Sequence, residues 1–450
     1  MKYLHYLFYA LLVGCNLWSP GWAAPQPNHA LVPIIHIEAG ILSPLGIGLE
    51  TGRQAKALFP DIERRYDQHL ASLFSDSTFD AVVRQRLPGL LKQLDKNYRD
   101  ELEGIAGAWA LTDSSQPGDG QLSQTEFQVL NLLPDLGFAA DGSGFGAYAE
   151  AAKDEYPIVG RNLDWGSTPA LRSLQAITVY QYPDKAVVNI GFAGIASILT
   201  GFNNQGLFLA HFNAEPYSPY RQQQVAANNR PVTSSVFRLR AALETQTSVA
   251  DAADELAKHA YGLSYSVLMA DKETVEAFEY SLHGTAQTRT PDSALRTQKW
   301  DRENQLAVVD CLMLQTMPDT CKDAKDAIHW QRLQALAKFN VEKPAELTDI
   351  SGLLLDTAND GYEIFNQNTL QSLVYLPSNN RLYLYAAPEG TPPDTPLHQP
   401  YLDLMPTLTD ELDGADLEIV LLTWLLLVGM LMLVTWSSRR KTRKQPSAST

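Results

Sequence analysis

The feature that most constrains this chain is an uncharged apolar run near its C-terminus, Ile419–Trp436. At 1.5 Å per residue a helix of this length spans about 27 Å, close to the thickness of a bilayer's hydrocarbon core. Acidic residues precede the run, and basic residues cluster directly after it, from Arg439 to Lys444. Because basic flanks stay cytoplasmic, the pattern predicts a single transmembrane helix with a cytoplasmic tail and an extracytoplasmic domain before Ile419.

The N-terminus predicts the same topology. Lys2 precedes an apolar stretch from Tyr3 to Val13, and Gly21-Trp22-Ala23 places small residues where a signal peptidase cuts. Residues 1–23 therefore read as a secretory signal. The stretch before Cys15 also resembles a lipoprotein box, which would place a lipid on Cys15. We favour simple cleavage because the C-terminal helix already supplies an anchor. The protein is expected in a cell membrane, with its folded part periplasmic or extracellular.

Composition describes an ordinary globular protein. Of the 450 residues 45% are hydrophobic and 19% are charged, and the formal net charge is -16. This negative balance argues against a nucleic-acid partner, because binding phosphates needs clustered Lys and Arg.

Two cysteines of the folded part, Cys311 and Cys321, lie ten positions apart. In an oxidising compartment this spacing predicts a small disulfide loop, and two unpaired thiols are the alternative. The histidines never approach a zinc-ligand pattern, so we expect no metal and no other cofactor.

Hydrophobic periodicity divides the chain into blocks. Apolar residues recur at helical spacing before Ala140, for example over Gln54–Phe74 and 79–94, and short strand-like runs such as Tyr265–Ala270 follow Gly142. Further helices are expected over 235–259 and 323–339. Blocks of this kind favour an α+β fold. The predicted regions are a signal peptide (1–23), a helical N-terminal region and candidate pro-segment (24–142), a folded domain (143–390), a Pro-rich and acidic linker (391–418), the membrane helix (419–436) and a basic tail (437–450).

The segment richest in potential chemistry is Val159–Trp165, VGRNLDW. Arg161 and Asp164 could hold and orient a charged group, although such a pair at a strand end is more often structural. The chain has no G-x-S-x-G elbow and no Walker loop.

GRNLDW resembles the segment that follows the nucleophile in the linear-amide C–N hydrolases: choloylglycine hydrolases, penicillin V acylases, acid ceramidase and N-acylethanolamine amidases. Other stretches match in the family's order over roughly residues 45–390. They are GLETGRQ (48–54), ELEGIAGAWA (101–110), TGFNNQGL (200–207) with Asn213 after it, VLMADKETVEAFE (267–279), IHWQRLQAL (328–336) and the hairpin through 375–385. The resemblance implies a four-layer αββα fold of the N-terminal-nucleophile type.

The resemblance also implies a mechanism. In this family the chain cuts itself before the nucleophile, whose freed α-amine then serves as the general base. Arg161 and Asp164 would position the nucleophile, Asn213 would donate to the oxyanion, and Arg332 would support the site. Trp165 and Asn203 fall in the matching segments and, together with Phe145 and Gln298, are expected to line the substrate pocket. The substrate would be a small N-acyl amide.

The family's cysteine is missing. Family spacing places it at Phe145, whose ring cannot act as a nucleophile. Ser143 lies two residues upstream, which keeps strand parity, and is the candidate nucleophile. The alternative is that Asp141–Phe145 (DGSGF) is only a glycine-rich turn. A second departure is Gln298, in a TQKW segment where the family tends to have T-N-H-F.

Two interpretations remain open at this point. The first is an amide hydrolase that uses Ser143. The second is a catalytically inactive descendant that keeps the pocket to bind a ligand or a partner, with Phe145 filling the nucleophile's place.

Overall fold

The structure, a computed structural model, describes residues 32–113, 116–138, 141–166, 168–214, 231–296, 299–321, 324–357, 363–387 and 402–403. The predicted signal peptide, the membrane helix, the basic tail and Gln298 lie outside these residues. Within the described ranges no helix is both long and apolar enough to cross a bilayer.

The larger sheet of the described structure has eight strands in the order β1-β4-β5-β6-β7-β8-β9-β10. Neighbouring strands are antiparallel except for β1 and β4, which are parallel. The bounds are β1 Ile34–Ile37, β4 Gln175–Gln181, β5 Ala186–Phe192, β6 Thr200–Asn203, β7 Phe208–Asn213, β8 Tyr265–Ala270, β9 Val275–Tyr280 and β10 Ala286–Arg289.

The smaller sheet, as far as the structure describes it, has six antiparallel strands in the order β11-β2-β3-β12-β13-β14. The bounds are β2 Asp141–Ala147, β3 Ile158–Asp164, β11 Gln305–Val309, β12 Thr369–Leu376, β13 Arg381–Ala386 and β14 Leu402–Asp403. The GRNLDW strand, β3, is therefore an interior strand of the smaller sheet.

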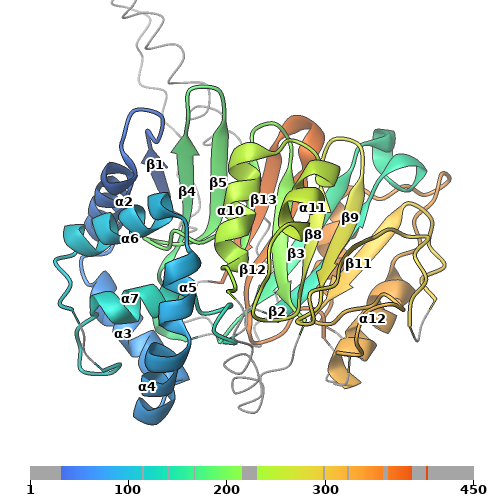
Figure 1. The fold of residues 1–450 in the computed structure, drawn as a ribbon. Coiled ribbons are helices and arrows are strands. Elements are labelled where there is room, and N and C mark those ends of the chain that lie inside the picture. The colour runs from blue at the N-terminus through green and yellow to red at the C-terminus, as the bar shows by residue number, and fades with distance from the viewer. Residues whose placement is uncertain are drawn as a thin grey trace, which may run out of the picture. The chain divides into compact units, whose positions relative to one another are not determined.

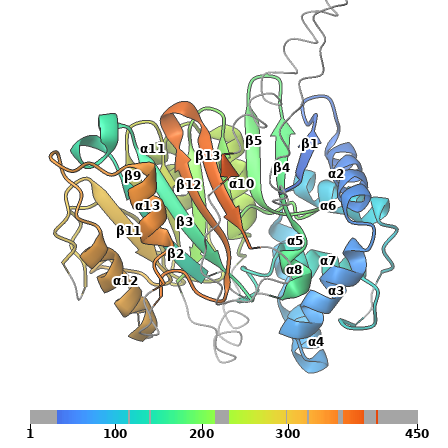
Figure 2. The same cartoon turned by 180° about the vertical axis from the view of Figure 1, so that it is seen from behind.

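The two sheets pack face to face, and helices cover both outer faces. Aromatic rings join the sheets: Tyr375 of β12 lies 4.4 Å from Phe202 and 5.5 Å from Phe208, centroid to centroid. Helices α10 (Ser235–Thr245) and α11 (Val249–Ala257) cover the larger sheet, while α12 (Ala324–Leu336) and α13 (Leu347–Leu354) cover the smaller one. Figures 1 and 2 show these helices on opposite sides. The layer order αββα agrees with the prediction.

The N-terminal helices gather at one end of the sandwich, in blue in Figures 1 and 2. The predicted helix over 54–74 is divided at Pro60, and that over 79–94 is divided before Pro88, because proline cannot continue a helix interior. These helices are α2 Pro44–Leu58, α3 Ile62–Leu73, α4 Asp76–Gln85, α5 Leu87–Gln93, α6 Lys96–Ala108 and α7 Gln124–Asn131, and a short α8, Pro169–Arg172, packs on α3.

The N-terminal region is not a separate layer. Strand β1 comes from it and pairs with β4 in the larger sheet, and residues of α2, α3 and α6 share one hydrophobic core with β4, β5 and β7. In the described structure one sheet and one hydrophobic core therefore contain residues from both sides of the predicted boundary at residue 142.

The glycine-rich segment Asp141–Ala147, for which a turn was the alternative, forms strand β2. It is a central strand, paired with β3 on one side and β11 on the other. Its glycines permit close approach of the two sheets: a Cβ at Gly144 would lie 2.8 Å from Leu268 and from Phe212, and one at Gly146 would lie 2.5 Å from Val275. Strand propensity disfavours glycine, but here the packing requires it.

Candidate functional site

The candidate site centres on Arg161, which is fully buried between the two sheets. Its Nη1 donates to the carbonyl oxygen of Leu199 at 2.7 Å and to Thr200 Oγ1, and its Nη2 donates to the carbonyl oxygen of His211 at 2.5 Å. The guanidinium carbon lies 4.8 Å from the centroid of the Phe212 ring. Its Nε has no hydrogen-bond partner among the described residues. Arg161 is thus held mainly by neutral acceptors.

The pKa of Arg161 lies well below the ordinary value of an arginine. Burial lowers the pKa of Arg161 to about 9, and the nearby carboxylates of Asp310 and Asp164 oppose that effect. A strongly perturbed charge of this kind is typical of functional sites, although structural ion pairs also produce it.

Asp310 is a site residue that the sequence did not reveal. It follows β11, and both of its carboxylate oxygens accept the backbone N–H of Gly142, at 3.0 and 2.9 Å. Gly142, the second residue of β2, has φ +151°, and a Cβ there would lie 2.0 Å from the carbonyl oxygen of Asn162. The position therefore requires glycine. Only the register of β11 on β2, which pairs Val309 with Ser143, brings Asp310 to this point.

The predicted pairing of Arg161 with Asp164 needs correction. The two residues are three apart on β3, and alternation along a strand assigns them to opposite faces. Asp164 accepts hydrogen bonds from Asn366 Nδ2 at 2.7 Å and from Thr369 Oγ1 at 2.6 Å. Its charge acts on Arg161 from a distance, and the hydrogen bonds described for it come from the loop before β12 and from the first residue of β12.

Ser143 and Phe145 share the face of β2 that points away from Arg161. In the antiparallel pairing Gly144 lies opposite Arg161, and Phe145 lies opposite Gly160, where a Cβ would meet Leu354 of α13 at 2.6 Å. Phe145 packs with its ring centroid 5.9 Å from Phe339 and 6.4 Å from Trp300. It is a core residue of the outer layer, so its predicted place in the substrate pocket, or as a plug beside Asp164, is wrong.

Ser143 is fully buried, and its Oγ has no hydrogen-bond partner among the described residues. Ser143 and Phe145 lie on the same face of β2, as strand alternation predicts, but this is the face that packs against α13. The positions of β2 that face Arg161 are Gly142, Gly144 and Gly146. In the uncut chain the Oγ therefore makes no hydrogen bond with Arg161 or Asp164.

Arg332 and Asn213, the other predicted catalytic residues, lie on two other faces of the sandwich. Arg332 of α12 forms an ion pair with Asp356, with Nη2 2.8 Å from Oδ1, in the helical layer outside the smaller sheet. Asn213 ends β7 opposite Tyr265, whose ring stacks on His211. Paired residues share a face, so the register assigns Asn213 to the α10 side of the larger sheet. The expected convergence of these residues with Arg161 on one pocket is therefore not the arrangement seen.

Two predicted pocket residues have structural roles instead. Asn203 is buried and uses both ends of its amide: Nδ2 donates to the carbonyl oxygens of Leu243 and Gln246, and Oδ1 accepts from two backbone N–H groups of the β6–β7 turn. Trp165 packs edge-on against His69 and Phe192 in the core beneath the N-terminal helices.

A second buried polar network lies behind Arg161. His211 Nε2 lies 3.1 Å from Ser235 Oγ, which donates to Asp135 Oδ1 at 2.7 Å, so the imidazole proton belongs on Nε2. Burial, aided by the charge of Arg161, lowers the pKa of His211 to about 3. The imidazole is neutral and its Nδ1 has no hydrogen-bond partner among the described residues.

Two open cavities lie away from the predicted site residues. One of about 780 Å³ is lined by residues near Arg302 and Val341, and one of about 670 Å³ by residues near His36 and Leu49. None of the predicted site residues lines either cavity. Within the described ranges no group of three His, Cys, Asp or Glu residues is placed to hold a metal ion. The predicted disulfide between Cys311 and Cys321 is confirmed.

No family model and no curated protein matches the chain. Among solved structures it is similar to a Caenorhabditis elegans ortholog of N-acylethanolamine-hydrolyzing acid amidase, at 16% identity over 55% of this chain and 100% of that one, with a TM-score of 0.41. It is also similar to a variant of the Clostridium perfringens conjugated bile acid hydrolase, at 11% identity over 58% of this chain and 92% of that one, with a TM-score of 0.35.

A third similar structure is penicillin V acylase from Agrobacterium tumefaciens, at 11% identity over 56% of this chain and 84% of that one, with a TM-score of 0.32. All three names belong to the group that GRNLDW resembles. Likenesses this weak leave the function to be argued from the residues themselves.

Proposed function

We propose that the protein is a hydrolase of linear amide C–N bonds, acting on small N-acyl amides, with Ser143 as its nucleophile after the chain is cut between Gly142 and Ser143. The observation that carries the proposal is the buried charge of Arg161. It lies opposite Gly144 of β2, its described hydrogen bonds go to neutral acceptors, and the carboxylates of Asp310 and Asp164 oppose the effect of burial on its pKa.

The cut is essential to this proposal because the uncut strand directs Ser143 away from Arg161. Once Ser143 is the first residue, rotation about its Cα–C bond exchanges the directions of its amine and its side chain. The Oγ could then attack a substrate's amide carbonyl carbon while the α-amine takes its proton. The C–N bond breaks, the amine leaves with a proton, and water releases the acyl group from the serine ester.

The mass of the purified protein tests the proposal. We expect a chain that begins at Ser143, together with release of amine from N-acyl amides. Ser143→Ala should leave the chain full length and inactive. Ser378→Ala is a matched control, because Ser378 Oγ is also a buried atom without a hydrogen-bond partner in the described structure. It should leave cutting and activity unchanged. An uncut chain that still hydrolyses amides would overturn the role of Ser143.

A second candidate function is ligand or partner binding without catalysis. The three glycines that β2 presents to Arg161, and the outward direction of Ser143, favour it. This function predicts an uncut chain, no amide hydrolysis, and a melting temperature that rises with an N-acyl amide in both the wild type and Ser143→Ala.

We also propose that the domain is extracytoplasmic and anchored by Ile419–Trp436. Support comes from the apolar run and the basic residues after it. A reporter fused after Thr450 should be cytoplasmic, and protease added outside intact cells should digest the domain. A domain protected from that protease would contradict the topology.

A further inference from the structure

The carboxylate of Asp310 binds the residue on the acyl side of the proposed cut. Gly142 supplies the carbonyl of the Gly142–Ser143 bond, and its N–H donates to both oxygens of Asp310 at 3.0 and 2.9 Å. Hydrogen bonds to an ionised acceptor are about twice as strong as neutral ones. Since Gly142 has no side chain, this contact orients the residue through its backbone.

Asp310 itself lies between two fixed points. On one side β11 holds it through the pairing of Val309 with Ser143, and the carbonyl oxygen of Ala307 accepts from Arg289 Nη2 at 2.8 Å. On the other side the next residue, Cys311, is bonded to Cys321. The backbone of Asp310 is therefore restrained on both sides, which keeps its side chain within reach of Gly142.

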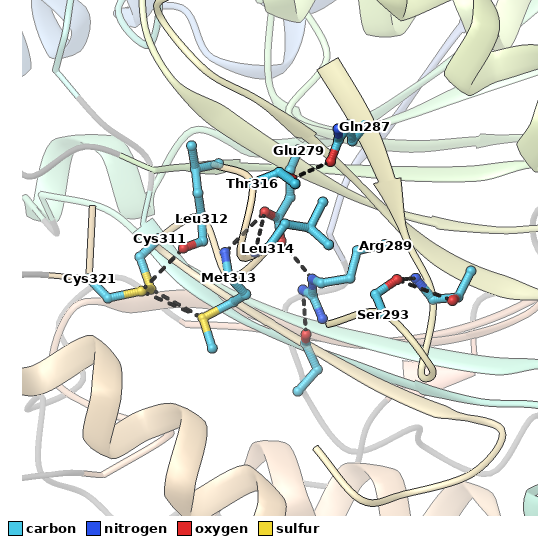
Figure 3. A network of polar contacts seen from close by, with 12 residues as sticks. Glu279, Gln287, Arg289, Ser293, Cys311, Leu312, Met313, Leu314, Thr316 and Cys321 are labelled. Atoms are coloured by element: carbon cyan, nitrogen blue, oxygen red, sulfur yellow. Dashed lines mark hydrogen bonds and ion pairs between the residues drawn. A yellow bond between two sulfur atoms is a disulfide. The ribbon is translucent and has the colours of Figure 1, made fainter. Parts of the chain in front are cut away.

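The disulfide loop, residues 311–321, is anchored to the larger sheet by Glu279 (Figure 3). Glu279 is fully buried, and its Oε2 accepts the N–H groups of Met313 and Leu314 at 3.0 and 3.1 Å. Its Oε1 accepts from Arg289 Nε at 2.6 Å. Leu312 N–H donates to Thr320 Oγ1 at 2.8 Å, which closes the loop on itself.

We infer that Asp310 is a positioning residue for the Gly142–Ser143 bond, and that the Cys311–Cys321 loop holds it in place. This inference deepens the proposed function, since the bond it positions is the one proposed to be cut. The chain of contacts runs from the loop through Asp310 to Gly142, and it requires nothing from the outward-facing side chain of Ser143.

Amide hydrogen exchange on the full-length protein tests the contact directly. In an uncut Ser143→Ala background, Asp310→Ala should speed exchange over 141–147 by about tenfold or more, because a hydrogen bond to a charged group is lost. Asp310→Asn keeps an acceptor oxygen and should restore much of the protection. Asp319→Asn, a change at an exposed position of the same loop, is the control and should leave exchange there unchanged.

The double variant Cys311→Ser, Cys321→Ser should also speed exchange over 141–147, by several-fold, while β5 at the far side of the larger sheet keeps its protection. In the otherwise native chain Asp310→Ala should slow cutting by about tenfold or more, and Asp310→Asn should recover part of the rate. Recovery by the conservative variant is expected of a positioning role and not of a general loss of structure.

Exchange over 141–147 that is the same in Asp310→Ala as in Asp319→Asn would overturn the inference. Unchanged exchange in the double cysteine variant would overturn the part assigned to the loop. A wild-type chain that is never cut would defeat the serine mechanism, yet the exchange measurements would still decide whether Asp310 holds Gly142, so the two failures are distinguishable.

Discussion

Two buried arginines in this fold are satisfied in opposite ways. Arg240 of α10 forms ion pairs with Glu101 at 2.7 Å and with Glu244 at 2.9 Å, and its guanidinium lies 4.0 Å from the ring centroid of Tyr180. Burial would lower the pKa of Arg240, but the carboxylates and tyrosines around it raise it well above its ordinary value. For Arg161 burial prevails, and the pKa falls to about 9.

The difference distinguishes an arginine that stabilises the fold from an arginine that belongs to the candidate functional site. Arg240 ties α6 and α10 to β4 and is neutralised by contact. None of the described hydrogen bonds that Arg161 donates goes to a carboxylate, and its counter-charges, Asp164 and Asp310, lie at strand ends. A group held in this way remains available to interact with a charge that develops beside it.

Arg240→Met should have the largest effect on stability. It would leave Glu101 and Glu244 buried without their cation, which typically destabilises a protein by about 3–5 kcal/mol. Urea unfolding measures this. Adding Glu101→Gln to the variant should recover part of the loss, and a loss no larger than that of Arg161→Met would break the distinction.

Measuring the free energy of unfolding as a function of pH tests whether His211, whose carbonyl oxygen accepts from Arg161, is buried with a neutral imidazole. The pKa of His211 falls from 6.5 to about 3 on folding. Below pH 6.5 the unfolded chain therefore binds a proton that the folded chain does not, and stability is lost as the pH falls towards 3. At pH 4 the loss is on the order of 3 kcal/mol from this residue.

His211→Gln should remove that part of the pH dependence, as measured by urea midpoints between pH 7 and pH 4. His69, with its pKa lowered to about 4 by burial, acts in the same direction, and burial of Asp135 raises its pKa and acts in the opposite one. The difference between variant and wild type isolates His211. Parallel titrations would show that the imidazole is not buried neutral.

Arg161→Met should have the smallest effect of the three. The change removes a buried charge that is costly to desolvate but leaves the carbonyl oxygens of Leu199 and His211 without this donor, so we expect a net change of about 1–2 kcal/mol. Activity or ligand binding should nevertheless be lost. A loss of 3 kcal/mol or more, of the size expected for Arg240→Met, would assign Arg161 to the fold instead of the site.

Much of the fold was predictable because it depends on local periodicity. Strand β8 has the predicted bounds, and the hairpin of β12 and β13 was expected. Strand β2 was not, because its glycines have low strand propensity and their role appears only when Leu268, Phe212 and Val275 of the opposite sheet are in place.

The site was less predictable. Arg161 was identified by its motif, but its partners come from β6, β7 and the end of β11, which no spacing in the sequence relates to it. The position of the nucleophile was predicted from the number of residues between it and the GRN motif. That number does not show which face of β2 is directed towards Arg161. Pairing of Gly144 with Arg161 decides that, and it turns Ser143 and Phe145 outward.

The sequence by itself determined what depends on neighbours along the chain. The order of helices and strands, the apolar run with its basic flank, and the short loop closed by Cys311 and Cys321 all follow from composition and spacing over a few residues. Only the tertiary structure decided which side chains meet. Strand register assigns each residue to a face, and contacts such as Asp310 with Gly142 join residues far apart in sequence through packing of the whole sandwich.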